Sequence, residues 1–307
     1  MDALRMREAS VLAALYAPES PFRLASPRDW PQLAALMARP GTPAELLAQA
    51  GYQPLAEALT PAALEWGWNA VSQGQVLTAA HAEFPRGWLT LLGKSAPPAL
   101  SLTGVVSAGR AVGVVGSRDL TDAQRSWARE VGAWLTAHGW MIVSGGARGT
   151  DAEAAAGARS TGPGARVVEI LAHGGEGRET PTCLRLLPTG AGFDVAVAHQ
   201  RNELIHAWSG VSVILASQSG AGGTWTGTVR AMRRWGLQAL VYQDGSPGTQ
   251  GLVEAGGTPW TTLAELEQRL AAAAPLRTPQ LFDLTDDPGG DAPLRVREAP
   301  VRWVKSS

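Results

Sequence analysis

The sequence predicts an α/β fold: a Rossmann-like, open and mostly parallel sheet with helices on both faces, preceded by a small helical domain. Two observations predict this fold class. From about residue 110, short apolar runs alternate with helical segments, which is typical of a parallel sheet flanked by helices. Up to about residue 72, prolines divide an Ala- and Leu-rich stretch into short helical pieces, which indicates a helical bundle.

Changes in composition divide the 307 residues into three parts. Residues 1–72 form the predicted helical domain, and residues 73–274 form the Rossmann-like domain. Residues 275–307 are rich in proline, glycine and acidic residues, so this tail is expected to be mostly extended or disordered. Within it, Val301 and Trp303 alternate with polar residues and Val304 follows, which is compatible with one docked strand.

Cap residues mark the helices of the first part. Ser26, Thr42 and Thr60 each precede a helical piece, and a proline at the first helical position follows each threonine. Between residues 75 and 110 the pattern changes to short extended pieces with glycine and proline, including residues 83–92. This stretch is expected to be a structured connector.

The Rossmann-like part begins with a strand at residues 111–116 and a helix at residues 120–139. Thr121 and Gln124 form a capping box at the start of this helix, and Gly139 suits its end. Further strands are predicted at residues 140–143, 165–171, 193–197, 211–216 and 237–242. Further helices are predicted to begin at Asp151 and near Asn202 and Thr224.

Composition excludes several classes of protein. The net charge of −1 and the pI near 6.5 make the attraction of the whole chain to polyanions weak, so a nucleic-acid surface must be a local patch. A single cysteine, Cys183, excludes a disulfide framework and fits a reducing compartment, so a cytoplasmic location is expected. No segment approaches the roughly 18 apolar residues of a membrane span, and the first twenty residues contain acidic residues and no long apolar run, so neither secretion nor membrane association is expected.

Patterns that carry covalent chemistry are missing from the sequence. The five histidines have no close metal-ligand spacing, and the nucleophile motif G-x-S-x-G is absent. Cys183 has only distant histidines to act as its base. No catalytic residue, metal or cofactor is therefore predicted.

Three loops that follow strands have residues suited to phosphate, since ligands of parallel sheets bind beyond the carboxyl ends of the strands. The first loop is Gly116-Ser117-Arg118, which offers close backbone approach, a hydroxyl and a charged guanidinium. A plain turn explains this short motif equally well.

The second loop lies between a strand and a helix and gives a stronger signal. Its backbone N–H groups and the helix dipole favour an anion. It has neither the Walker spacing nor the dinucleotide-binding spacing, and the alternative is a tight turn with Thr150 as the helix cap. The predicted phosphate-binding residues of this loop are Ser144, Gly145, Gly146, Ala147, Arg148 and Gly149.

The third loop also opens a helix, and this helix carries several arginines. Two glycine-rich helix openings on one sheet favour a single extended anionic ligand. Arg201 and Asn202 precede this loop and extend the predicted site, although an ordinary surface turn explains them as well. Trp225 is the one tryptophan placed to stack on a base, with core packing as the alternative. The predicted residues of this loop are Ser219, Gly220, Gly222, Gly223 and Thr224.

Taken together, the motifs resemble the DprA/Smf family in their order and rough spacing. They are VGVVGSRDLT, MIVSGGARGTDAEAAAGA, RNELIHAWSGVSVILA and SGAGGTW, and the resemblance covers about residues 75–245. It implies a helical domain followed by a Rossmann-like domain that binds single-stranded DNA and forms a homodimer. It also implies that the protein protects incoming strands and helps to load RecA, the recombinase, during natural transformation. The motifs that match the family contain most of the loop residues named above.

Some segments depart from the family pattern. Residues 172–190 replace its glycine-rich Y-P-x-E-N segment, Glu203 stands at a position that is basic in the family, and no C-terminal winged helix is evident. The AGGTW loop is similar to loops of nucleotide-binding Rossmann proteins. An alternative is therefore a nucleotide-binding or nucleotide-hydrolysing enzyme or sensor, resembling the phosphoribohydrolases, with Arg201 and Glu203 as its catalytic pair.

Overall fold

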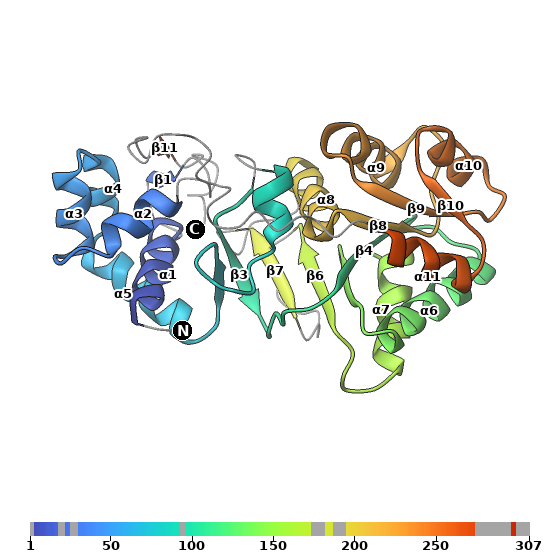
Figure 1. Ribbon diagram of the computed structural model, residues 1–307, viewed down its shortest axis with the longest axis horizontal. Coiled ribbons are helices and arrows are strands. Elements are labelled where there is room, and N and C mark those ends of the chain that lie inside the picture. The colour runs from blue at the N-terminus through green and yellow to red at the C-terminus, as the bar shows by residue number, and fades with distance from the viewer. Residues whose placement is uncertain are drawn as a thin grey trace, which may run out of the picture.

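The computed structural model describes residues 3–17, 22–24, 30–92, 96–172, 182–186, 195–273 and 296–298. A group of short helices lies at one end of the molecule, and a long sheet with helices on both faces forms the rest (Figure 1). This arrangement confirms the predicted fold class.

The helices of the first region are α1 (Ala3–Leu15), α2 (Trp30–Met37), α3 (Pro43–Gln49), α4 (Gln53–Ala58) and α5 (Pro61–Ser72). Two of the predicted caps are confirmed. The Thr42 side chain accepts a hydrogen bond from the Glu45 N–H and forms a capping box with Glu45, and the Thr60 side chain accepts from the Ala63 N–H. Ser26, the third predicted cap, lies outside the described residues.

A two-stranded sheet joins the two ends of the chain. Strand β1 (Phe22–Leu24) pairs antiparallel with β11 (Val296–Glu298), which belongs to the predicted tail. This part of the tail is therefore a paired strand. The predicted strand around Val301 and Trp303 lies outside the described residues.

The main sheet has nine strands in the order β10-β9-β8-β4-β5-β6-β7-β3-β2. Pairing is parallel from β10 to β7, whereas β3 is antiparallel to both β7 and β2. The strands are β2 (Val76–Thr78), β3 (Ala99–Thr103), β4 (Ala111–Val115), β5 (Met141–Ser144), β6 (Val167–Leu171), β7 (Cys183–Leu186), β8 (Val211–Ile214), β9 (Gln238–Tyr242) and β10 (Thr258–Trp260).

Helices cover both faces of this sheet (Figure 1). On one face, α6 (Asp122–Ala137), α7 (Thr150–Ser160) and α11 (Leu263–Ala272) bury apolar side chains against the strands. On the other face lie α8 (Val195–Ser209), α9 (Gly222–Trp235) and α10 (Pro247–Glu254). The predicted capping box of α6 is confirmed, because Thr121 and Gln124 exchange side-chain and backbone hydrogen bonds.

Two local predictions are wrong. Residues 195–197 open α8 rather than completing a strand at 193–197, so this helix begins seven residues before Asn202; residues 193 and 194 lie outside the described residues. The Val-Ala-Val-Ala run alternates like a strand, yet it is part of a helix that packs across β4, β5, β6 and β8.

The second wrong prediction concerns residues 83–92. They contain a π-helical turn at Trp88–Leu92 instead of an extended piece, and Trp88, Leu89 and Leu92 are buried there. The Trp88 ring packs edge-on against Phe84 and Trp208, and its Nε1–H donates a hydrogen bond of 2.7 Å to the Leu204 carbonyl oxygen. This burial favours the helical turn over an extended piece.

Strands β4 and β8 lie side by side at the point where the sheet reverses its winding. The helix after β4 lies on one face, and the helix after β8 lies on the other. The two connections therefore diverge and leave a crevice beyond the carboxyl ends of these strands, which is where open α/β sheets bind ligands.

Candidate functional site

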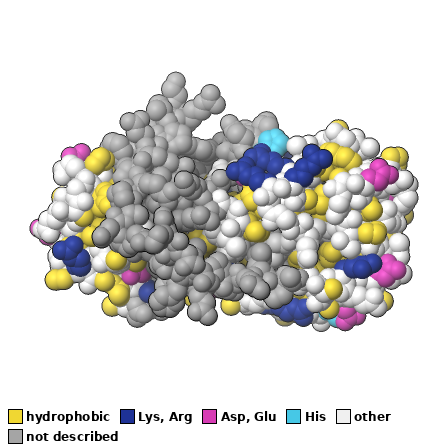
Figure 2. Space-filling view, turned by 45° about the horizontal axis from the view of Figure 1, so that its top comes forward, with side chains coloured by type: hydrophobic (Ala, Val, Ile, Leu, Met, Phe, Trp, Pro, Cys, Tyr) yellow, Lys and Arg dark blue, Asp and Glu magenta, His cyan; other side chains and the backbone are white. Residues whose placement is uncertain are grey.

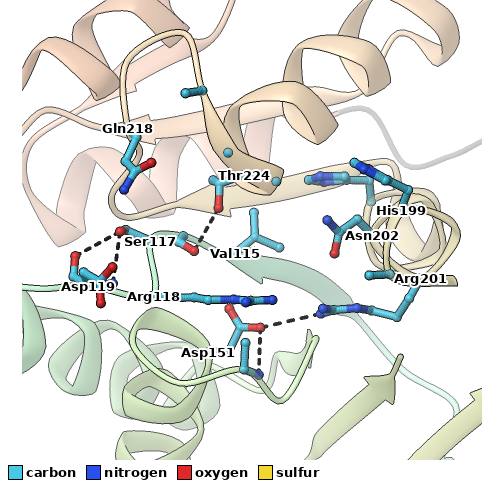
Figure 3. Close-up of a pocket in the computed structure, with 17 residues that line it drawn as sticks. Val115, Ser117, Arg118, Asp119, Asp151, His199, Arg201, Asn202, Gln218 and Thr224 are labelled. Carbon is cyan, nitrogen blue, oxygen red and sulfur yellow. Dashed lines mark hydrogen bonds and ion pairs between the residues drawn. The ribbon is translucent and has the colours of Figure 1, made fainter. Parts of the chain in front are cut away.

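A cavity of about 350 Å³ occupies this crevice (Figure 3). Its walls are the loop after β4, the loop after β8 with the start of α9, and one side of α8. Ala147 and Asp151, from the loop after β5 and the start of α7, complete it. The three loops singled out in the sequence thus meet at one edge of the sheet.

The loop after β4 supplies a free cation. The Ser117 hydroxyl donates to the Asp119 carbonyl oxygen at 2.9 Å and accepts from the Asp119 N–H at 3.2 Å, so it is engaged within its own turn. Arg118 is exposed and has no hydrogen-bond or carboxylate partner among the described residues. Its side chain extends into the cavity toward Arg201 (Figure 3).

The loop after β5 is closed by its own carboxylate. Asp151 Oδ2 accepts hydrogen bonds from the Gly145 N–H at 2.9 Å and the Ala147 N–H at 3.4 Å, and it lies 3.9 Å from Arg201 Nη1. Burial raises the pKa of Asp151, while the charge of Arg201 and the two amides act in the opposite direction. Asp151 therefore occupies the anion position that the sequence assigns to a phosphate.

Glycine at position 149 allows the second loop to lie against the first. Gly149 has φ +80°, and a Cβ atom there would lie 2.4 Å from the Ser117 carbonyl oxygen. That same oxygen accepts hydrogen bonds from the Thr150 N–H and hydroxyl, both at 3.1 Å. The cap of α7 is Gly149 and not Thr150, so the alternative role of Thr150 as a helix cap is wrong; its side chain joins two loops instead.

The loop after β8 leaves the amino end of α9 open. Its cap residue, Ala221, makes no side-chain cap bond, and no group in the described ranges accepts a hydrogen bond from the N–H groups of Gly222 or Gly223. These N–H groups and the helix dipole favour an anion in the cavity. The Thr224 hydroxyl donates to the Gly116 carbonyl oxygen at 2.9 Å, which ties this loop to the first.

Helix α8 brings a second guanidinium to the cavity. Arg201 is only 6% exposed, and its Nε has no hydrogen-bond partner among the described residues. Burial lowers the pKa of Arg201, Asp151 counteracts this, and the nearby charge of Arg118 lowers it further. Two guanidinium groups that repel each other therefore face the cavity, and only Arg201 is paired with the Asp151 carboxylate. This arrangement favours an additional anion between the two arginines.

Other polar groups of α8 complete this wall. Asn202 and His199 line the cavity, with His199 exposed (Figure 3). His206 is 2% exposed and lies 3.0 Å from the Ser212 hydroxyl. Burial, together with the charge of Arg201, lowers the pKa of His206 to about 4, so this ring is neutral at pH 7.

The structure brings nine of the sixteen predicted residues together around the cavity: Gly116, Ser117, Arg118, Ala147, Arg201, Asn202, Gly222, Gly223 and Thr224. Ser144 is fully buried, and the backbone of Gly145 binds Asp151. Arg148 is exposed and forms an ion pair of 3.0 Å with Asp119. The predicted residues that do not line the cavity are Ser144, Gly145, Gly146, Arg148, Gly149, Ser219 and Gly220.

Sequence reasoning missed Asp151, His206 and Gln218, which also line the cavity. A signal for Asp151 exists, because an acidic residue in the first turn of a helix accepts backbone N–H groups readily. Nothing in the sequence distinguishes Gln218 from other loop residues.

Each helix in the described part of the chain is too short or too polar to span a lipid bilayer. The described ranges also contain no cluster of three or more His, Cys, Asp or Glu side chains that would hold a metal ion.

Comparison with known proteins decides the family. Residues 75–271 match the family described as DNA recombination-mediator protein A. The chain belongs to this family. The resemblance to the DprA/Smf motifs is thereby confirmed, and the match extends about 26 residues beyond residue 245, where the stretch covered by the resemblance ends. A search of curated protein sequences found no match.

Two solved DprA structures share the fold. DNA processing protein A from Streptococcus pneumoniae is 16% identical, with a TM-score of 0.58 over 87% of this chain and 98% of its own. DNA processing protein A from Helicobacter pylori, studied for its single-stranded DNA binding mode, is 19% identical, with a TM-score of 0.54 over 64% of this chain and 96% of its own. At such identities the likeness establishes the fold.

Proposed function

We propose that this DprA-family protein binds single-stranded DNA in the cavity between β4 and β8 and acts in DNA processing during natural transformation. The observation that supports this most is that Arg118, Arg201 and the open amino end of α9 face the same space. Family membership gives the class of ligand, and the cavity gives the groups that would hold it.

In the proposed complex, the amino end of α9 receives one phosphate of the DNA backbone, and Arg118 receives a neighbouring one. Arg201 is held in place by Asp151, so it acts as a fixed positive charge behind these contacts. Contacts to phosphate carry no sequence information, so binding is expected to be independent of base sequence. A rigid double helix does not fit inside a cavity of about 350 Å³, whereas a flexible single strand can bend its backbone into it.

The cavity needs little rearrangement to bind. Its first loop is tied to the second by Thr150 and to the third by Thr224, and the Ser117 N–H donates to the Ala216 carbonyl oxygen at 3.0 Å. Groups that are already in place before binding lose less entropy when the ligand arrives.

The test compares single-stranded DNA, duplex DNA and a mononucleotide by fluorescence anisotropy and salt titration. We expect tight binding of the single strand alone. Arg118→Ala should weaken this binding about tenfold and reduce the salt slope by about 0.7, the value for one lost phosphate contact on a single strand. Arg269→Ala removes one exposed arginine from α11 on the opposite face and should change neither quantity. Equal effects of the two substitutions would contradict the proposed site.

We also propose that the protein is not an enzyme. In the phosphoribohydrolase-like alternative, Arg201 and Glu203 act on a nucleotide, yet Glu203 does not line the cavity. Its carboxylate pairs with Arg230 at 3.0 Å, and Arg201 is buried against Asp151. Incubation of the purified protein with nucleoside monophosphates should therefore release no free base, and release of base would restore the enzyme alternative.

Family membership supports three further parts of this proposal: loading of a RecA-type recombinase, a homodimer and a cytoplasmic location. Light scattering of the purified protein tests the dimer. Strand-exchange assays with and without the protein test the loading of recombinase onto coated strands. Fractionation of cells tests the location.

A further inference from the structure

Next to the cavity, α9 carries a second surface that the proposed site does not use. A shallow groove of about 560 Å³ begins at Gly220 and runs along this helix past Trp225, Val229, Arg230, Arg233 and Arg234. Side chains three and four residues apart share one face of a helix, so these side chains form one continuous strip. We call it the α9 strip.

The α9 strip is strongly basic. Arg233 and Arg234 are exposed, and neither has a carboxylate partner in the described part of the chain. Arg230 is paired with Glu203 but remains half exposed. Figure 2 shows basic side chains gathered over the region of α8 and α9, beside a histidine. A local basic patch of this kind attracts a polyanion although the net charge of the protein is −1.

The strip also has an apolar floor. Trp225 and Val229 line the groove and are partly buried against the main core. Trp225 is thus partly packed, which is one of the two roles that the sequence left open, and it also borders the groove, where a base would have to stack for the other role. Aromatic rings beside arginines are the combination with which proteins hold single strands, as bases stack on the ring and phosphates meet the guanidinium groups.

The strip is continuous with the cavity. The loop of residues 217–224 contributes Gln218 to the cavity and Gly220 to the groove, and α9 starts in the one and runs along the other. From Gly223 to Arg233 the helix rises about 15 Å, at about 1.5 Å per residue. That length corresponds to about four stacked nucleotides at about 3.4 Å each.

We infer that the α9 strip is a second contact surface for the same DNA strand, which leaves the cavity over Gly220 and follows α9 toward Arg234. This inference rests on the proposed function. Bases would stack on Trp225, and Arg233 and Arg234 would contact phosphates.

The strip predicts that affinity depends on strand length. An oligothymidylate of about 2 nucleotides occupies the cavity of about 350 Å³ alone, whereas one of about 20 nucleotides also reaches the strip. The double variant Arg233→Ala/Arg234→Ala should bind the short strand with an affinity within about twofold of that of the unchanged protein. It should weaken binding of the long strand about tenfold or more and reduce its salt slope by about 1.4, for two lost phosphate contacts.

The matched control is Arg39→Ala/Arg269→Ala, which removes the same charge from exposed positions in the first region and on α11. It should affect neither strand. Binding of the short strand reports on folding and on the cavity. If the Arg233→Ala/Arg234→Ala variant loses affinity equally for both strands, or for neither, the inference about the α9 strip is wrong. If the unchanged protein binds no single strand at all, the proposed function fails first.

Trp225 gives an independent readout. Trp225→Phe keeps an aromatic ring and should retain affinity for the long strand within about twofold, whereas Trp225→Leu keeps apolar packing and should lose about fivefold or more. Equal affinities of these two variants for the long strand would overturn the stacking role.

Discussion

At the scale of single residues, the buried charges of Arg201 and Asp151 and the buried ring of His206 affect the stability of the fold around the site. Arg201 and Asp151 form a buried pair, whereas Arg118 is exposed and free to move toward a ligand in the cavity. Removing either member of a buried pair leaves the other uncompensated, so these two residues are expected to matter for stability as much as for binding.

His206 makes the stability of the fold dependent on pH. In the folded state its pKa is about 4, whereas the unfolded value is about 6.5, so below pH 6.5 the unfolded state binds the proton more readily. The free energy of unfolding should therefore fall as pH is lowered from about 6.5 to about 4. The full loss over this interval is about 3 kcal/mol.

Urea unfolding at pH 7 and pH 4.5 measures this loss. His206→Gln cannot take up the proton, so its free energy of unfolding should change less between the two pH values than that of the unchanged protein. His199→Gln alters an exposed histidine of the same helix and should behave like the unchanged protein. A pH dependence that is identical in all three proteins would show that His206 does not titrate in this way.

Residue identity alone pointed to much of the candidate site but did not predict that Asp151 accepts hydrogen bonds from amides of the second loop. Gly116, Arg118 and Gly222 were recognisable because glycine and arginine after a strand are typical of phosphate sites. For Asp151 the position in the first turn of a helix is a signal, but a sequence does not show whether loop amides will bind an external anion or a carboxylate of the same chain. Only the fold decides that question.

At the scale of elements, the sequence predicts a helix well where local signals mark its ends and poorly where packing decides its structure. The sequence predicted α6 closely, because a capping box and a glycine stop fix its two ends. It failed at α8, because a short Val-Ala alternation fits a strand and a buried helix equally well. Tertiary packing on four strands, which the sequence does not display, makes that stretch helical.

Gly149→Ala tests the contact between the second loop and the first. Gly149 and Gly139 have nearly the same backbone angle, φ +80° and φ +77°, but a Cβ at Gly139 meets nothing within 4 Å. Gly139→Ala should cost about 1–2 kcal/mol of stability from backbone strain alone. Gly149→Ala adds a clash with the Ser117 and Arg118 carbonyl oxygens and should cost about 3 kcal/mol or more.

Thermal or urea unfolding of the two glycine variants gives these differences directly. Binding of single-stranded DNA should also weaken in the Gly149 variant, because the clash displaces the loop that carries Arg118. The Gly139 variant lies at the far end of α6 and should bind normally. Equal stabilities of the two variants would contradict the close contact of the loops.

At the scale of the whole molecule, the helical region and the sheet share one core. A single buried cluster runs from Leu12 and Leu15 of α1 through Leu77 of β2 to Trp88 and Leu204. Sequence composition suggested a boundary near residue 72, but composition does not show whether two parts bury their apolar faces against each other.

This shared core predicts cooperative unfolding. In urea, far-UV circular dichroism and tryptophan fluorescence should report one coincident transition, because the first region cannot unfold without exposing the apolar side chains beneath it. The α5 residues Trp66 and Trp68 and the sheet residue Trp260 place reporters in both regions. Two separated transitions would indicate independent domains.

The carboxylate that closes the loop after β5 has a consequence for selectivity in a cell rich in orthophosphate and free nucleotides. Empty amides in this loop would add a further position for such small solutes, beside the amino end of α9, and the solutes would have to leave before a polymer could bind. Because the Asp151 side chain belongs to the protein and already accepts a hydrogen bond from the Gly145 N–H, small anions cannot bind at this position. The remaining contacts are weak one at a time, so only a long polyanion that engages many of them together gains avidity.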